Sequence, residues 1–266
     1  MAEVLRLDQP RPIVRSGQLL RIARASGGIV LFLLLWEAAP RLGLVDRIFL
    51  PPFSEVARTW AGLAGSGQLE QHLGASLGRS LAGLLLAAAV AIPLGLLIGW
   101  YRRIGELLTP LLELFRNTAA LALLPVFVLL LGLGETAKIA LIVFACTWPI
   151  LLNTINGVRT TDPLLTRSAR SLGFGSAQLF TKVVLPGAVP TIFTGIRLAA
   201  ANSILVLVAA EMVGAKAGLG YLITTAQYNF QVPQMYAGIL TISLLGLAFN
   251  QALSALERRL SRWRST

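Results

Sequence analysis

Polar side chains that could contact a solute are few in this sequence, and they lie in or beside long apolar stretches. Asparagine, threonine, serine and arginine donate hydrogen bonds, which a small anion crossing an apolar layer would need together with positive charge. For each single side chain a bond between two packed helices is the favoured alternative, and Arg197 could equally extend to the edge of the layer. The candidates for a solute path are Asn117, Thr118, Asn153, Thr154, Arg197, Asn202 and Ser203.

The sequence offers little that could catalyse a reaction or hold a cofactor. Cys146 is its one cysteine and His72 its one histidine, and the acidic residues do not cluster. An intrachain disulfide and a cysteine-based metal site are therefore excluded. A loop of the form Gly-xxxx-Gly-Lys-Ser/Thr is absent, because Gly132-Leu133-Gly134-Glu135 has neither the lysine nor the hydroxyl group. We expect no metal, no cofactor and no ATPase site in this chain, and an exposed His72 without a role.

The composition is that of a protein whose solvent is lipid. Of the 266 residues, 55% are hydrophobic and 13% are charged, and the mean hydropathy is +0.72, which is too apolar for an ordinary soluble domain. A net charge of +11 would suit nucleic acid if the cationic residues formed a patch with aromatics between them. Arg and Lys instead lie mostly between and beyond the apolar blocks, so we expect contact with anionic lipid and none with nucleic acid.

Six apolar blocks predict an all-α membrane protein with about six transmembrane helices. A block of about 20 residues is long enough to cross the hydrocarbon layer. Gly95 and Gly99 in the second block are small residues that let two helices approach closely. The blocks cover about residues 27–39, 81–100, 107–133, 136–155, 190–213 and 235–256.

The segments between the blocks predict the orientation of the chain. Residues 41–80 form a more polar extramembrane connector, in which Pro51 and Pro52 prevent a helix and Ser54 can cap a short following one. The segments rich in Arg and Lys all fall on one side of six spans, which predicts cytoplasmic N and C termini. We divide the chain into a basic arm (1–24), a transmembrane domain (25–256) with a cytoplasmic loop (158–187), and a basic tail (257–266).

The cytoplasmic loop contains two predicted short helices. Asp162-Pro163 is typical of a helix start and Gly173 of a helix stop. The second helix would run over 177–184, capped by Ser176 and ended by Leu185-Pro186. The first helix is amphipathic, so it could dock on a partner protein or lie on lipid headgroups, and its sequence favours neither. Its apolar residues are Leu164, Leu165, Ala169 and Leu172, and its basic residues are Arg167 and Arg170.

This loop resembles the EAA loop of binding-protein-dependent ABC permeases. The opening Glu-Ala-Ala of that motif stands here as Arg167-Ser168-Ala169, while the spacing to Gly173 and to Leu185-Pro186 is kept. The residues that carry the resemblance are Arg167-Ser168-Ala169-Arg170-Ser171-Leu172-Gly173, followed by Gln178-Leu179-Phe180-xx-Val183-Val184-Leu185-Pro186-xxx-Pro190.

The resemblance covers nearly the whole chain from Trp36-Glu37 onward and is closest to the nitrate, sulfonate, taurine and bicarbonate branch. The order and spacing of several stretches together make it specific. They are Leu50-Pro51-Pro52-Phe53-Ser54-Glu55-Val56, Gly132-Leu133-Gly134-Glu135-Thr136-Ala137-Lys138, Pro149-Ile150-Leu151-Leu152-Asn153-Thr154, and Ala210-Glu211-Met212-Val213-Gly214 with Gly218-Leu219-Gly220.

The resemblance implies a type I ABC importer permease in the bacterial inner membrane. A second permease copy, two ATPase subunits that bind ATP and Mg²⁺, and an extracytoplasmic solute-binding protein would be its partners. It also implies a small, anionic cargo and a gating role for Glu211 on the periplasmic side, whereas Glu37 is expected to be an ordinary interfacial group. The residues that would couple the chain to the ATPase are Leu164, Leu165, Arg167, Ala169, Arg170, Leu172, Gly173, Leu185 and Pro186.

Two other interpretations stay open at this point. A self-contained secondary transporter would show inverted repeats with ionisable residues at mid-membrane, and no such repeat is evident. An ABC importer permease for another cargo, such as a thiamine precursor, would have the same pattern of helices, because selectivity in such systems lies largely in the binding protein.

Overall fold

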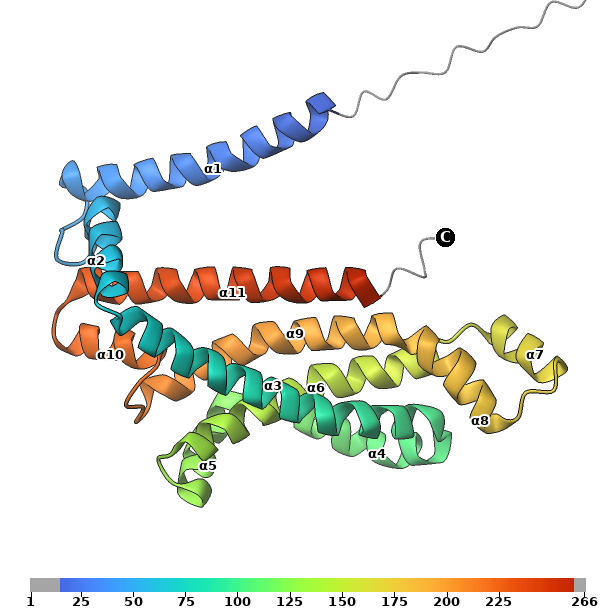
Figure 1. Ribbon diagram of the computed structural model, residues 1–266. Helices are drawn as coiled ribbons and strands as arrows, with labels where there is room; N and C mark the ends of the chain where they lie inside the picture. Colours follow the sequence, from blue (N-terminus) through green and yellow to red (C-terminus); the bar gives the residue numbers. More distant parts are fainter. Residues whose placement is uncertain (1–14, 261–266) are drawn as a thin grey trace, which may run out of the picture. The chain divides into compact units, whose positions relative to one another are not determined.

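The computed structural model describes residues 15–260, and side-chain surroundings for residues 27–255 and Glu257. Within this part of the chain every regular element is helical (Figure 1). The predicted arm and tail lie partly outside the described residues. The chain forms two compact units, residues 1–58 and 59–266, which are described separately.

The first unit contains α1 (Arg15–Arg41) and the start of α2 (Phe53–Gly65). Glu37 accepts hydrogen bonds from the backbone N–H of Ser54 at 2.9 Å and from its hydroxyl at 2.8 Å. The prediction that Ser54 caps α2 is therefore wrong. The Glu37 carboxylate instead accepts from a free N–H of the first turn, and its negative charge is stabilised by the positive end of the helix dipole. Trp36 fixes the same corner, where its Nε1 donates to the carbonyl of Pro51 at 3.0 Å.

Three long helices form the core of the second unit: α3 (Gln68–Trp100), α6 (Glu135–Arg159) and α9 (Leu185–Met212). Small residues allow α3 and α6 to approach closely, as predicted. A Cβ atom on Gly95 would lie 2.6 Å from Cβ of Thr154, and one on Gly99 would lie 2.8 Å from Cβ of Val158. Side chains such as Leu141 and Ile150 are consequently fully buried between the helices, and Cys146 is buried there too, as expected.

The helix α3 begins earlier than expected. Residues 68–80, which were assigned to the connector at 41–80, are the first turns of this continuous helix. At about 1.5 Å per residue, the 33 residues of α3 span about 50 Å. Because the hydrocarbon layer is only about 30 Å thick, the polar first turns can extend beyond it without interrupting the helix.

The third apolar block is a bent segment. It contains α4 (Arg102–Arg116), the short 3-10 helix η1 (Ala120–Leu123) and α5 (Leu124–Leu131), and the two arms meet at 81°. The break covers residues 117–119, which agrees with the interruption expected at Arg116-Asn117-Thr118. A proline, Pro125, occupies the first turn of α5, where a missing N–H costs little.

The loop between α6 and α9 begins as predicted and ends differently. The first helix, α7, spans Pro163–Ser171. After it, α8 (Ser176–Leu179) and the π-helical turn η2 (Phe180–Val184) run directly into α9. The predicted stop at Leu185-Pro186 is wrong, because the backbone N–H of Leu185 bonds to the carbonyl of Phe180 in a widened turn that accommodates the proline.

The last two helices, α10 (Leu219–Tyr228) and α11 (Val232–Leu260), follow a turn after α9. In Figure 1 the start of α3, α10 and the far tip of α5 lie at one end of the second unit, and α7 and α8 lie at the other. We call these the α10 end and the α7 end. Trp60 joins α11 to the end of α2, since its Nε1 donates to the hydroxyl of Thr241 at 3.0 Å.

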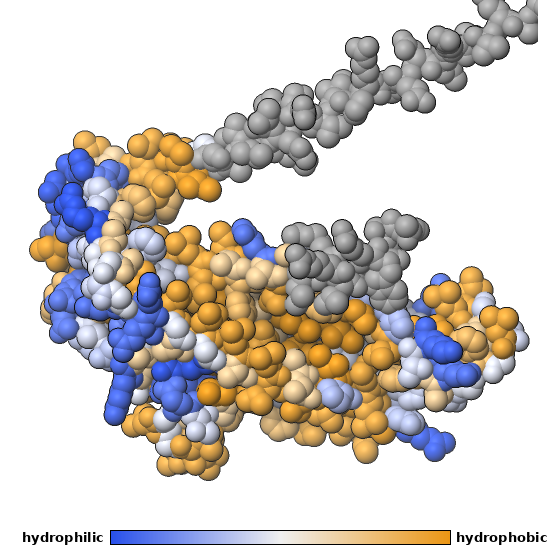
Figure 2. Space-filling view, viewed as in Figure 1, coloured by the Kyte–Doolittle hydropathy of each residue, from blue (hydrophilic) through white to orange (hydrophobic). Residues whose placement is uncertain are grey.

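Four described helices are long and apolar enough to cross a membrane, or five if the bent segment counts as one span. The first expected span lies in α1, part of which is outside the residues with described side chains. Figure 2 shows a broad hydrophobic surface over the second unit between its two ends. In the same unit, Leu85, Leu129 and Leu205 are more than 60% exposed, as expected of side chains that face lipid or another subunit.

Candidate functional site

An ion-pair network joins three helices at the α10 end of the second unit. Arg79 comes from α3, Glu135 from the first turn of α6, and Glu211 from the last turn of α9. Nη1 of Arg79 lies 2.6 Å from Oε1 of Glu211 and 2.6 Å from the carbonyl oxygen of Ala217. Its Nε and Nη2 atoms bind the two oxygens of Glu135, the latter at 2.9 Å. One guanidinium therefore holds both acidic side chains.

The Glu211 carboxylate is fully buried and fully hydrogen-bonded. Besides Arg79, it accepts from the hydroxyl of Ser76 at 2.9 Å and from the backbone N–H of Gly220 at 2.9 Å. A charge out of water is stable only with such compensation. The approach also requires glycine, since a Cβ on Gly220 would lie 2.8 Å from Cβ of Glu211.

The turn between α9 and α10 is held against α3 by the same network. Ser76 accepts from the backbone N–H of Leu219 at 2.8 Å, and Nδ1 of His72 accepts from that of Gly218 at 3.1 Å. His72 also lies beside the ring of Tyr221. The expectation of an exposed His72 without a role is therefore wrong: the residue is half-buried and positions this turn.

Sequence reasoning missed Arg79, Ser76 and His72 as members of this network. A signal was present, because positions 72, 76 and 79 have the spacing of one helix face. This spacing is informative only if α3 begins near Gln68. It was not used, because residues 68–80 were assigned to a connector. Glu211, in contrast, was singled out, and its predicted gating role stays a prediction.

At the α7 end, the helix α7 is fixed at both of its ends. Asp162 accepts from the backbone N–H of Leu164 at 2.8 Å. Gly173 has a φ of +84°, and the bonds from Gly173 to Arg170 and from Phe174 to Ala169 form a complete Schellman motif. The predicted start at Asp162-Pro163 and stop at Gly173 are confirmed.

Most of the apolar side chains on and just after α7 are exposed together with the basic ones. Ala169 is buried, whereas Leu164, Leu165 and Leu172 are 68%, 57% and 77% exposed. Arg167 and Arg170 are exposed as well, and Leu185 and Pro186 are partly buried where η2 meets α9. The loop thus presents apolar and cationic groups on a rigid helix, and its role in coupling stays a prediction.

Five of the predicted path residues bond to other groups of the protein, either within their own helix or on a neighbouring one. Thr154 and Ser203 are buried; Thr154 donates to the carbonyl of Ile150, and Ser203 shares a bond with Ser80. Asn153 and Asn117 each donate to a carbonyl four residues earlier, and Arg197 pairs with Glu257. None of these five residues lines either of the two cavities described next.

Two of the predicted residues, Thr118 and Asn202, do lie in one cavity. Its volume is about 360 Å³, and it is bounded by the break after α4, by α6 and by α9. Arg116, Phe144 and Trp148 are in its wall. Sequence reasoning missed Trp148 here because a tryptophan in an apolar block has the ordinary pattern of a core residue.

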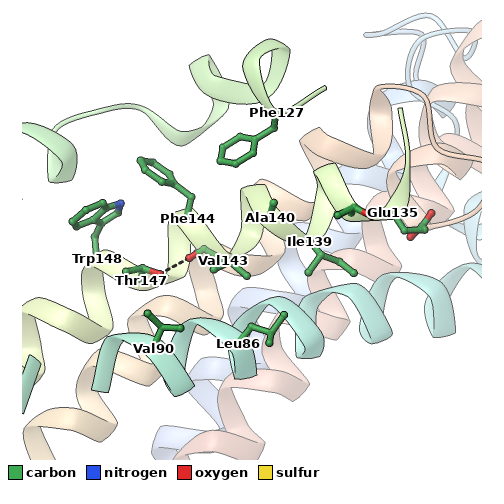
Figure 3. A pocket seen from close by; sticks show the side chains of 11 residues that line it. Leu86, Val90, Phe127, Glu135, Ile139, Ala140, Val143, Phe144, Thr147 and Trp148 are labelled. Atoms are coloured by element: carbon green, nitrogen blue, oxygen red, sulfur yellow. Dashed lines mark hydrogen bonds between the residues drawn. The ribbon is translucent and has the colours of Figure 1, made fainter. Parts of the chain in front are cut away.

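A second, apolar groove of about 630 Å³ shares Phe144 and Trp148 with this cavity. Figure 3 shows these two rings with Phe127 along one side of the groove, and Leu86 and Val90 of α3 on the opposite side. Phe144 and Trp148 therefore separate a cavity with polar groups from one that is almost entirely apolar.

Comparison with known proteins agrees with this architecture. Residues 91–262 match the family described as binding-protein-dependent transport system inner membrane component. A Bacillus subtilis protein named for aliphatic sulfonates transport, the permease SsuC, is 36% identical over 232 residues, which cover 87% of this chain and 84% of that protein. The Escherichia coli taurine transport system permease protein TauC is 35% identical over 248 residues, or 91% and 90% of the two chains.

Among solved structures, an inward-facing form of the MetNI methionine ABC transporter has a chain that aligns with a TM-score of 0.65 at 17% identity. The alignment covers 74% of this chain and 98% of that one, and it shows a shared fold. The chain belongs to the family of binding-protein-dependent transport system inner membrane components, and it is the transmembrane permease subunit of an ABC importer in the inner membrane.

Proposed function

We propose that this permease imports a small organic sulfonate such as taurine, and that two copies of the chain form the translocation path. The observation that carries this proposal is the 35–36% identity with the sulfonate and taurine permeases over almost the whole chain. A solute-binding protein would deliver the sulfonate to the α10 end, and two separate ATPase subunits would bind ATP and Mg²⁺ at the α7 end. No step in this mechanism requires a cofactor in the permease.

The helix α7 is the proposed contact with the ATPase. It is nine residues long and capped at both ends, so a push on it would be passed as one unit to α6 before it and α8 after it. Leu164, Leu165 and Leu172 give it a large exposed apolar area, which supports burial in a groove of a partner protein. Because Arg167 stands where the family motif has glutamate, we expect an acidic rather than a basic surface opposite it.

The ion-pair network at the other end is the proposed gate. Arg79 and Glu211 lie on two different core helices, so movement of α3 against α9 must break their bond or carry both helices together. Such a buried pair would have two discrete arrangements, paired or separated, which would correspond to a closed and an open gate. Closure of the ATPase subunits would supply the energy through α7 and α9.

Reconstitution tests this function directly. The permease, its ATPase and its binding protein would be placed in liposomes, and uptake of radiolabelled taurine, nitrate and bicarbonate would be measured with ATP present. We expect ATP-dependent uptake of taurine that exceeds uptake of the two inorganic anions. Uptake driven by an ion gradient without the ATPase would instead support the secondary-transporter interpretation, and preference for a thiamine precursor would contradict the proposed cargo.

A further inference from the structure

The end of α3 and the helix α8 enclose a groove that has no part in the proposed function. Its volume is about 590 Å³, and we call it the α3–α8 groove. Both walls lie towards the α7 end of the second unit (Figure 1). Among the described residues, no acidic side chain lines it. Leu96, Leu97, Trp100 and Tyr101 are on the α3 wall, and Ala177 and Phe180 are on the opposite wall.

The walls of the α3–α8 groove are apolar and partly open. Leu97 is 44% exposed and Tyr101 is 52% exposed, although another face of α3 packs closely against α6. The rings of Trp100 and Phe180 meet edge to face with their centroids 5.1 Å apart, which joins the two walls. An acyl chain in this groove would therefore make dispersion contacts with both walls.

The groove ends at the level of the membrane–water boundary. The apolar part of α3 ends at Trp100, and Tyr101 is followed directly by Arg102 and Arg103. Tryptophan and tyrosine are enriched at this boundary, because each has an apolar ring and a polar group. The groove thus extends from the hydrocarbon level near Pro93 to the level of the lipid headgroups near Tyr101.

Two arginines lie beside the α3 wall at the headgroup level. Consecutive Cα atoms are about 3.8 Å apart, so the Cα atoms of Arg102 and Arg103 both lie within about 8 Å of that of Tyr101. Arg102 is paired with Glu106. Arg103 is exposed, and no described residue pairs with it. The α3 wall therefore has one positive charge that no described carboxylate compensates.

A lysine supplies a second positive charge beside the opposite wall. Lys182 follows Phe180 by two residues and is exposed. Its Nζ atom lies 5.6 Å from the centroid of the Phe174 ring, and no described carboxylate forms an ion pair with it. Cationic groups thus flank both walls of a groove that is apolar below them. Basic pockets between membrane helices of this kind suit acidic lipid headgroups.

We propose that the α3–α8 groove binds an anionic phospholipid. One acyl chain lies against Trp100 and Phe180, and the phosphate group lies between Arg103 and Lys182. Because α8 runs through η2 directly into α9, the bound lipid holds the loop that carries α7 against the end of α3. This goes beyond the proposed function and does not depend on the cargo.

Two other occupants fit the observations less well. A water-soluble ATPase would not reach the part of the groove near Pro93, which lies on the membrane side of Trp100. A second permease copy carries the same net charge of +11 and would bring further cations to Arg103 and Lys182. An anionic lipid supplies the opposite charge together with the apolar chain.

The test measures which lipid the purified complex of permease and ATPase retains. The delipidated complex would be incubated with equal amounts of phosphatidylglycerol and phosphatidylcholine that have the same acyl chains. After gel filtration, the retained lipid would be quantified by mass spectrometry. We expect retention of phosphatidylglycerol in preference to phosphatidylcholine. Equal retention of the two lipids, or no retention, would overturn the proposal, as would retention by the permease alone that is lost when the ATPase binds.

Leu97→Trp tests whether the retained lipid lies in this groove. Leu94 and Leu97 are both 44% exposed on α3, and only Leu97 lines the groove. Leu97→Trp would fill the groove and should lower the retained phosphatidylglycerol severalfold, whereas the matched control Leu94→Trp should retain as much as the wild type. Should Leu97→Trp lower the yield of the complex, Ala177→Leu fills the groove from the opposite wall and must give the same loss. Equal retention in the groove-filling variants and the control would place the lipid elsewhere.

Arg103→Gln and Lys182→Gln test the headgroup contact. Each lost cation should lower the preference for phosphatidylglycerol about fivefold, and the double variant should retain the two lipids equally. Retention of phosphatidylcholine should not change in any of these variants. Arg58→Gln, which removes an exposed arginine of α2, is the control and should keep the wild-type preference. A wild-type preference in the double variant would overturn the proposal.

Discussion

Arg79 on α3 and Glu211 on α9 are 132 residues apart in sequence, and they form a direct ion pair with Nη1 and Oε1 separated by 2.6 Å. The Glu211 side chain is completely buried and that of Arg79 is 9% exposed. The desolvation of such a pair can cancel much of its attraction, so its presence alone is weak evidence of stabilisation. Removal of only one of the two charged side chains is expected to destabilise the protein, because the other charge stays buried.

We expect Arg79→Met to destabilise the permease by about 3–5 kcal/mol, the usual cost of leaving one partner of a buried ion pair alone. Glu211→Met should cost less, since Arg79 keeps its ion pair with Glu135 and its bond to the Ala217 carbonyl. Thermal unfolding of the detergent-solubilised protein measures both. The double variant Arg79→Met/Glu211→Met should lose less than the sum of the single losses.

Glu135→Gln is the matched control for this pair. Its side chain is 58% exposed, so water can compensate for the lost charge, and the expected change is at most about 1 kcal/mol. Equal losses for Glu135→Gln and Glu211→Gln would show that burial does not decide the energetics of the network. A strictly additive double variant would show that Arg79 and Glu211 are not coupled.

Gly218→Ala should disrupt the turn that covers Glu211. Gly218 has a φ of +129°, and an added Cβ would collide with the Glu211 carboxyl group. Strain of this kind costs about 1–3 kcal/mol, which should appear as a lower unfolding temperature. Gly74→Ala, in the exposed first part of α3 with open space around it, should be neutral or slightly stabilising. If the two variants have the same unfolding temperature, the turn does not depend on glycine at position 218.

The sequence allowed the membrane class, the core spans, the start of α7 and its stop at Gly173 to be predicted, because each has a local cause. Apolar length specifies the spans, and a cap with a left-handed glycine specifies α7. The continuation of the helix from η2 through Pro186 could not be predicted, since a proline within a helix normally ends or kinks it. Val184 and Ala188, on either side of this proline, are buried against Val158 of α6, a contact that the local sequence does not show.

The candidate sites were predicted in part for a similar reason. Thr118 and Asn202 were singled out as polar residues in or beside apolar stretches, and Glu211 was singled out through the resemblance to the permease family. Arg79 and Trp148 were not, because the features that distinguish them are tertiary: Arg79 meets two carboxylates from α6 and α9, and the Trp148 N–H has no described acceptor. The spacing of His72, Ser76 and Arg79 marks one helix face, but it does not show which carboxylates meet Arg79, and the unpaired N–H of Trp148 has no counterpart in residue spacing.

Gly95→Val should separate α3 from α6. A Cβ at position 95 would lie 2.6 Å from Cβ of Thr154 and 3.0 Å from the carbonyl oxygen of Leu151, so the helices must move apart. Overpacking of this kind costs about 1–3 kcal/mol. Gly78→Val on the same helix meets open space and should cost less than about 1 kcal/mol. Chemical or thermal unfolding in the same detergent compares the two, and equal losses would contradict close packing at Gly95.

Gly173→Val should prevent α7 from ending correctly. The φ of +84° at this position is strained for a β-branched residue, so the Schellman bonds from Gly173 and Phe174 would be lost and Leu172 would move. If α7 is the contact with the ATPase, then co-purification of the ATPase and taurine-stimulated ATP turnover should both fall severalfold. The membrane yield of the permease itself should not change, because the space around Gly173 is open.

Gly173→Asn distinguishes a conformational effect from a loss of glycine as such. Asparagine adopts the left-handed conformation more readily than other residues with a side chain, so this variant should retain most of the ATPase binding that Gly173→Val loses. Unchanged complex yield and turnover in Gly173→Val would exclude α7 as the coupling helix. Equal losses in both variants would mean that the ATPase contacts the glycine surface directly, with the shape of the turn having no separate effect.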